Sequence, residues 1–312
     1  MIGSRIDCCA AMLGCLLVSV AALPAQEATE PAEKSWDLRP VWQEGQTSRY
    51  RVVTERASIT QASGQERSTS MRVEADMNWK VTRPNPDGGG EVEMSVERIS
   101  LKITGPNDQT LETTDRGGDE QLEDYHQFLQ ALVGPRMIVQ VAADGTIASI
   151  SGWEAVKNNG GAAGEQLTEN DFQETAYELA PLAGGAADLL PGANWQQQFQ
   201  WRHEIGPMDY DSRYELTGVE HLAGIPIGII NRTSRINVTP ELPETADASS
   251  DVRITQAEET AQILFDFSRQ EVVGQNIDRL LSIDITISVQ GRSITLSRTE
   301  TVNTQVLRIA EE

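Results

Sequence analysis

Cysteine is absent from most of this 312-residue sequence. Its three cysteines, Cys8, Cys9 and Cys15, all lie close to the N-terminus. The chain beyond Cys15 therefore cannot form an internal disulfide bond, a zinc–thiolate site or a thiol nucleophile. We expect a mature chain without these residues to have a stability that is insensitive to reducing agents.

Histidine is also scarce, and sequence motifs for metals, cofactors and catalysis are missing. His126, His203 and His221 are too far apart for zinc-ligand pairs, which are usually spaced by roughly three to five residues. The acidic pair in Asp209–Asp211 lacks the glycine and the later glutamate of a calcium loop. No Gly-x-Ser-x-Gly elbow, phosphate-binding loop or dinucleotide fingerprint is found. The sequence therefore predicts no metal, no cofactor and no catalytic residue, and it favours a non-enzymatic protein.

Basic residues are also few compared with acidic ones. The chain has 25 Lys and Arg residues against 47 Asp and Glu residues, which gives a net charge of −22. Such a charge repels the phosphate backbone of nucleic acids and the surface of anionic membranes. Because the acidic residues are dispersed along the chain, we interpret them as a solvated surface. Nucleic acid is therefore excluded from the predicted partners.

The only long apolar run lies at the start of the chain. Cys8–Ala22 follows the basic residue Arg5, and Leu23-Pro24-Ala25 ends in the small residue that signal peptidase requires. The run is about fifteen residues long, shorter than the roughly 20 that cross a bilayer as a helix. We predict that residues 1–25 are a signal peptide cleaved after Ala25. The protein would then be exported to the periplasm or the exterior of a bacterial cell, with no membrane span in the mature chain.

A lipid anchor is the alternative at this end of the chain. Leu13-Gly14-Cys15 is similar to a lipoprotein cleavage box. The apolar run nevertheless continues to Ala22, beyond the point where a lipidation site should end it. The sequence therefore favours cleavage after Ala25 over lipidation.

Alternating patterns typical of β-strands dominate the rest of the chain. The clearest pattern places apolar residues on successive odd positions, namely Met71, Val73, Ala75, Met77, Trp79 and Val81. Such alternation predicts a strand with one buried and one solvated face. After a loop at Pro84–Gly90, the apolar positions change from even at Val92–Val96 to odd at Ile99–Ile103. This change of phase requires a β-bulge near Glu97-Arg98.

Two segments have the spacing of helices. Apolar residues recur every three or four positions between residues 119 and 133, which predicts a helix that ends at Gly134-Pro135. Thr168 is a suitable N-cap for a shorter helix that extends to Leu179. Between these helices, Ile138–Ile150 contains an Asp-Gly pair and is predicted to form a hairpin.

A second β-rich half begins after Pro191-Gly192, a pair that ends the preceding structure. In the strand that follows, Trp195, Phe199 and Trp201 share one face and glutamines occupy the other. We predict that the aromatic face belongs to the core and meets a ligand only at one edge.

The last two strands are predicted to be joined by a two-residue turn at Gly291-Arg292. In that register, Arg298 and Glu300 lie opposite Ile285 and Ile283. Two charges on an apolar face lie either at the exposed end of the sheet or in the lining of a cavity.

These patterns predict a mainly β protein with a few helices. The predicted order is a signal peptide at 1–25, a flexible tether at 26–41, a first β lobe at 42–153 that includes the helix at 119–133, an Ala/Gly-rich helical connection at 154–191, and a second β lobe at 192–312 with a mobile loop at 240–251. We expect two coupled antiparallel lobes of curved sheet, which a duplication could have produced, with a helix packed on the first. The alternative is a single, highly curved half-barrel sheet around a helix.

Part of the second lobe resembles a known group of proteins. The segment Tyr214–Glu220, Gly224 before Ile225, and Leu264–Phe267 leading to Val272-Val273 are similar to a family of secreted bacterial β-rich proteins of unknown function. The resemblance extends over roughly residues 42–309 and implies an exported β-rich protein without assigning a catalytic residue. Gln270 departs from the pattern, because a turn glycine is expected at that position.

The favoured function is the binding or carriage of an apolar or extended ligand in the cell envelope by a curved sheet. One alternative is a structural or interaction protein of the envelope that has no small-molecule ligand. Another is a hydrolase that uses two carboxylates. The candidate ligand-facing residues are Trp79, Trp195, Phe199, Trp201, Arg298 and Glu300.

Overall fold

The computed structural model describes residues 34–86, 88–143, 145–165, 167–180, 182, 186–203, 206–240, 248–289 and 292–310. The predicted signal peptide, its cleavage site at Ala25 and most of the predicted loop at 240–251 lie outside the described residues. The last part of that loop, Ala248–Asp251, belongs to a strand.

The described strands are β1 (Thr47–Ala62), β2 (Gln65–Pro84), β3 (Gly90–Thr104), β4 (Thr110–Thr114), β5 (Gly117–Gly118), β6 (Arg136–Val141), β7 (Ile147–Ser151), β8 (Asn194–His203), β9 (Gly206–Leu222), β10 (Ile225–Val238), β11 (Ala248–Asp266), β12 (Glu271–Val289) and β13 (Arg292–Ile309). The helices are the 3-10 turn η1 (Glu120–Leu122), α1 (Glu123–Leu132), α2 (Glu154–Asn159), α3 (Gly161–Glu165) and α4 (Glu169–Leu179). None of the helices in the described ranges has the length and apolar character needed to cross a membrane.

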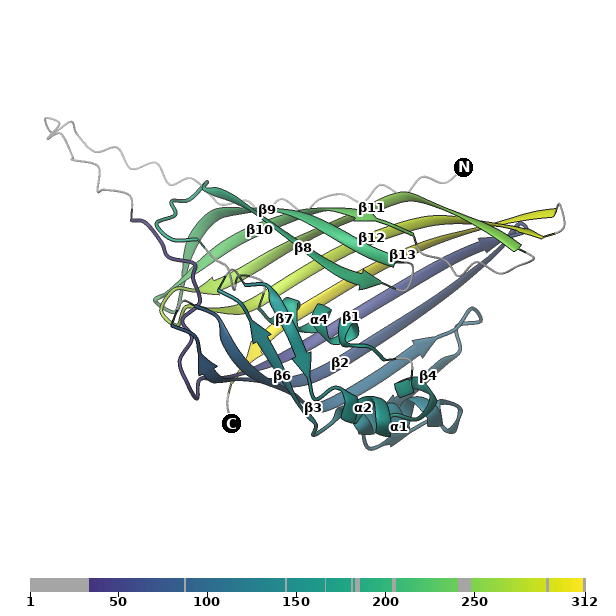
Figure 1. Cartoon of the computed structure of the whole chain (residues 1–312), viewed down its shortest axis with the longest axis horizontal. Coiled ribbons are helices and arrows are strands. Elements are labelled where there is room, and N and C mark those ends of the chain that lie inside the picture. The colour runs from purple at the N-terminus through teal and green to yellow at the C-terminus, as the bar shows by residue number, and fades with distance from the viewer. Residues whose placement is uncertain are drawn as a thin grey trace, which may run out of the picture. The chain divides into compact units, whose positions relative to one another are not determined.

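The described strands form one antiparallel sheet (Figure 1). Its order is β5-β4-β3-β2-β1-β13-β12-β11-β10-β9-β8, and β6 and β7 extend it beside the first part of β3. The sheet is curved and open, with β5 and β8 at the two ends of this order. Pairing of β1 with β13 joins the strands of the two predicted lobes. The prediction of a mainly β, antiparallel and curved fold is confirmed, and its strands make a single sheet.

The change of apolar phase along β3 has the predicted cause. Asp76 of β2 pairs with Arg98, whereas the next residue, Met77, pairs with Val96, so Glu97 is an extra residue in β3. This bulge lets Val96 and Ile99, which are at even and odd positions, both be buried. The predicted helices and the predicted hairpin formed by β6 and β7 are also observed.

The predicted register of the last two strands was wrong by two residues. The ladder between β12 and β13 ends with the pair Val289 and Arg292, so Arg292 belongs to the strand and not to the turn. A shift of two residues leaves each side chain on its predicted face, because side chains alternate with a period of two. The observed opposite pairs are Arg298 with Ile283 and Glu300 with Leu281.

One face of the sheet, which we call the inner face, carries the core and α4 (Figure 1). Phe172 and Leu179, on one side of α4, join a core cluster with residues of β1, β2, β3 and β6. Tyr177 joins a second cluster built from β8, β9, β10 and β12. The helix is therefore buried between the two halves of the sheet.

The segment before β1 is attached to the second half of the sheet. Trp36 forms a β-bridge with Leu189, and Leu38 is completely buried in a cluster that includes Tyr214. Residues 36–38 thus differ from the flexible tether predicted for 26–41. The physical reason is that two apolar side chains in this otherwise polar stretch are removed from water.

Candidate functional site

A cavity of about 250 Å³ lies on the inner face between α4 and the strands β1, β2 and β3, with α1 and β6 completing its walls. We call it the inner cavity. It is lined by the apolar residues Val52, Val73, Ala75, Met77, Met94, Val96, Ile99, Phe128, Leu132, Met137, Leu167 and Phe172 and by the polar residues Thr54, Asp171, Thr175 and Glu178.

The strand patterns explain why this wall is apolar. Inward-facing positions alternate along β1 and β2, and the bulge at Glu97 brings both Val96 and Ile99 to the same side. Two methionines of the wall, Met94 and Met137, are fully buried. Because unbranched thioether side chains fill irregular gaps, this wall can adapt to apolar molecules of different shape.

Helix α4 places one buried carboxyl group, Glu178, in the lining of the inner cavity. Glu178 is 7% exposed, and no other described residue forms a hydrogen bond or an ion pair with it. Burial raises the pKa of Glu178 to about 8, and the negative charge of Glu174 adds to this increase. At neutral pH the group is therefore mostly protonated.

The other carboxyl group in the lining, Asp171, has a different environment. It is exposed, and its Oδ2 accepts hydrogen bonds from the Thr168 N–H at 2.8 Å and from the Thr168 hydroxyl at 2.9 Å. These contacts hold the first turn of α4. Asp171 is thus engaged at the start of the helix, whereas Glu178 has no such contact.

A network of buried charges lies next to Glu178. Glu259 Oε1 accepts a hydrogen bond from Arg232 Nη2 at 2.7 Å, and its Oε2 accepts one from Arg279 Nε at 2.9 Å. Arg279 Nη1 also pairs with Glu174 Oε1 at 2.7 Å. Removing such charges from water is costly unless they are paired. The two arginines are balanced by Glu259 and Glu174, which leaves Glu178 without a counterion of its own.

Aromatic rings enclose the same network. The guanidinium group of Arg279 lies 4.8 Å from the ring centroid of Trp201, and that of Arg232 lies 5.7 Å from the ring of Tyr177. The hydroxyl groups of Tyr177 and Tyr214 share a hydrogen bond of 2.8 Å. Burial raises the pKa of Tyr177 well above its ordinary value, so this phenol stays neutral. The network thereby connects α4 with the far strands of the sheet.

Trp79 is the next inward-facing residue after Met77 on β2. It is 7% exposed and borders a smaller cavity of about 50 Å³ together with Tyr50. Trp79 is therefore close to the inner cavity without lining it.

The three aromatic residues predicted on β8 lie in the second half of the sheet. Trp201 is 7% exposed and packs on Tyr210, with ring centroids 4.1 Å apart. Phe199 is half-buried beside both rings, and the half-buried Trp195 stacks on Tyr214 at 5.2 Å. The structure groups these residues with one another and not with the inner cavity. A ligand contact at their edge stays a prediction.

Arg298 and Glu300 form a polar group further along the inner face. Arg298 Nη2 lies 2.6 Å from Glu300 Oε2, and Arg56 Nε lies 3.4 Å from Glu300 Oε1. Glu300 is 5% exposed, whereas Arg298 and Arg56 line a hollow of about 590 Å³. This pair is separate from the inner cavity, and its contact with a ligand stays a prediction.

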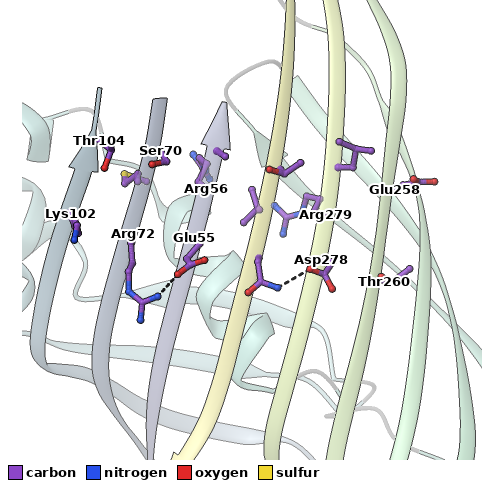
Figure 2. Close-up of a pocket in the computed structure, with 16 residues that line it drawn as sticks. Glu55, Arg56, Ser70, Arg72, Lys102, Thr104, Glu258, Thr260, Asp278 and Arg279 are labelled. Carbon is purple, nitrogen blue, oxygen red and sulfur yellow. Dashed lines mark hydrogen bonds and ion pairs between the residues drawn. The ribbon is translucent and has the colours of Figure 1, made fainter. Parts of the chain in front are cut away.

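A hollow of about 700 Å³ crosses β3, β2, β1, β13, β12 and β11, mainly on the face opposite to α4 (Figure 2). Two of its charged side chains pair with each other, and Arg56 and Arg279 pair with carboxylates outside the hollow. Arg72 pairs with Glu55, and Asn303 Nδ2 donates a hydrogen bond to Asp278 at 2.8 Å. The lining of this hollow is mostly charged and polar, whereas that of the inner cavity is mostly apolar, as is usual for ligand pockets, so we favour the inner cavity as the candidate site.

Sequence reasoning missed the inner cavity and Glu178. The sequence nevertheless contained a sign that α4 is enclosed. Tyr177 and Leu179, the neighbours of Glu178, are both apolar and lie on different sides of the helix. A helix with apolar residues around most of its circumference is one that is enclosed. Within the described parts of the chain, no three His, Cys, Asp or Glu side chains are grouped so that they could hold a metal ion.

No family model and no curated protein matches this chain. Among solved structures, one of lipovitellin is 12% identical over 86% of this chain, with a TM-score of 0.49, and the matched region is 26% of the lipovitellin chain. A DUF1329 family protein from Desulfovibrio piger is 9% identical, with a TM-score of 0.13. The match covers 84% of this chain and 87% of that protein. A putative outer membrane lipoprotein-sorting protein domain from Vibrio parahaemolyticus is 7% identical, with a TM-score of 0.16. The match covers 88% of this chain and 89% of that domain. Each score is below 0.5, so function has to be inferred from the residues of this chain.

Proposed function

We propose that this protein is an exported binding or carrier protein of the cell envelope and that it holds an apolar ligand in the inner cavity. The observation that carries the proposal is the cavity itself, about 250 Å³ in volume and apolar except for Thr54 on β1 and three residues of α4. The pattern of residues 1–25 supports export. Transfer of the ligand's apolar surface out of water drives the binding.

The volume restricts the ligand to a small molecule or to one chain of a larger molecule. An engineered apolar cavity of about 150 Å³ binds benzene, and ligand pockets usually measure about 300–1,000 Å³. The inner cavity, at about 250 Å³, lies between these sizes. A single ring or an alkyl chain of moderate length satisfies this limit.

Titration calorimetry with 1-octanol tests the proposal. The wild type should bind this probe, and Ala75→Leu should weaken binding on the order of tenfold because the larger side chain occupies the cavity. Ala57→Leu is the matched control, since it makes the same change at an exposed position of the neighbouring strand β1. This control should bind 1-octanol as tightly as the wild type.

Native mass spectrometry of protein purified from its own host provides a second test. A copurifying small apolar molecule that is lost in Ala75→Leu would support a carrier. A folded wild type that binds neither a host molecule nor 1-octanol would overturn the proposal. The remaining candidate would then be an envelope interaction protein with no small-molecule ligand.

A further inference from the structure

Glu178 brings a buried carboxyl group to a mostly apolar cavity wall. Its carboxyl group is buried, lines the inner cavity and has no hydrogen-bond or ion-pair partner among the described residues. Buried polar groups are normally paired, and an unpaired one at a cavity indicates a missing partner. We propose that the ligand of the inner cavity is an amphiphile with a basic nitrogen, whose ammonium group pairs with Glu178. This inference rests on the proposed function and specifies the ligand class.

The charges around the site support a cationic partner. Glu178 faces Glu174 on its own helix, Arg232 on β10, Glu259 on β11 and Arg279 on β12. The two arginines already pair with Glu259 and Glu174 at 2.7–2.9 Å. An ionised Glu178 would therefore leave one negative charge in excess in a buried region. A bound ammonium group would neutralise it.

Other head groups fit this environment less well. An anionic head group would gain only a hydrogen bond from protonated Glu178, and it would lie near the carboxylates of Glu174 and Asp171, whose repulsion desolvation strengthens. An alcohol can share a hydrogen bond with protonated Glu178, but it gains no pairing of charges. The distinguishing property is thus a preference for an amine over an alcohol of the same length.

This preference has a defined pH dependence. The pKa of Glu178 is about 8 in the free protein because of burial, whereas an alkylammonium group keeps its proton up to about pH 10. Formation of the ion pair requires Glu178 to release its proton. The affinity for an amine should therefore rise about tenfold per pH unit up to about pH 8 and then level off. The affinity for an alcohol should not follow this course.

The test is titration calorimetry of n-octylamine and 1-octanol at pH 6, 7, 8 and 9. Wild-type protein should bind n-octylamine on the order of tenfold more tightly than 1-octanol at pH 9. Glu178→Gln should lose this preference and its pH dependence while it still binds 1-octanol. Glu123→Gln is the matched control, because it makes the same change at an exposed position of α1 that does not line the inner cavity. It should behave as the wild type does.

Equal affinities of the wild type for the two probes at pH 9 would overturn the assignment of an amine ligand and leave the proposed function standing. An unchanged preference in Glu178→Gln would overturn it in the same way. If the folded wild type binds neither probe, the proposed function itself fails.

Discussion

Burial of Glu178 makes the stability of the folded chain depend on pH. Its pKa rises from an ordinary value of 4.5 to about 8, so between these values the folded state holds a proton that the unfolded state has released. The free energy of unfolding should therefore fall as the pH rises through this window, by up to about 1.4 kcal/mol per pH unit from this group. Below about pH 4.5 both states are protonated, and the contribution no longer changes.

Glu178→Gln removes this titration and provides the first prediction. Relative to the wild type, the variant should gain stability between pH 5 and pH 8, on the order of a few kcal/mol at the upper end. Urea unfolding of both proteins at pH 5, 6, 7 and 8 measures the difference. A difference that stays constant across this range would contradict a raised pKa.

Trp201 should be the main anchor of β8. Its buried ring packs on Tyr210 and under the guanidinium group of Arg279. Trp201→Ala should lower the free energy of unfolding by about 3–5 kcal/mol. Trp195→Ala, a matched change at a half-buried position of the same strand, should cost clearly less. Equal losses in chemical denaturation of the two variants would show that burial of Trp201 does not hold this strand.

The turn at Gln270 could be predicted from the sequence, whereas the burial of Glu178 could not. Gln270 stands where the family pattern leads one to expect a turn glycine, and its φ of 53° confirms a left-handed backbone at this position. The burial of Glu178 was not predicted, because a glutamate on a short helix is ordinarily solvated. Its burial depends on strands that pack on α4 from distant parts of the chain, and the local sequence indicates it only through the apolar neighbours Tyr177 and Leu179.

At the level of elements, the N-terminus of α4 allows a test of how the helix is held over the cavity. The Thr168 N–H and hydroxyl both donate to Asp171 Oδ2. Thr168→Ala removes the hydroxyl and should lower the free energy of unfolding by about 1 kcal/mol, whereas Thr168→Ser should retain most of the stability. Urea unfolding distinguishes them. Equal losses in both variants would mean that the hydroxyl contributes nothing.

The faces of the strands could be predicted better than their pairing. Alternation along β2 identified the buried side, and the change of phase along β3 located the bulge at Glu97, because both are local properties of the chain. The register of β12 with β13 could not be settled in this way. Two registers that differ by two residues bury the same side chains, so the apolar pattern does not distinguish them.

At the scale of the whole molecule, the pairing of β1 with β13 decides the architecture. It connects the two predicted lobes, and the Ser48 hydroxyl supports the junction by donating to Glu271 Oε2 at 2.7 Å. Strands so far apart in sequence leave no local sign that they are partners. The boundaries at 42–153 and 192–312 rest on composition and stay a prediction. The inner cavity could not be predicted for the same reason, because its walls come from strands and helices that are far apart in the sequence.

The central claim is that an apolar ligand enters the inner cavity, and NMR spectra of the protein with ¹³C-labelled methionine methyl groups test it most directly. Met77, Met94 and Met137 line the cavity, whereas Met208 is 1% exposed in a different core cluster. Addition of 1-octanol should cause saturable shifts of the three cavity methyl signals and leave that of Met208 unchanged. Unmoved signals from Met77, Met94 and Met137 at saturating 1-octanol, or an equal shift of Met208, would contradict the claim.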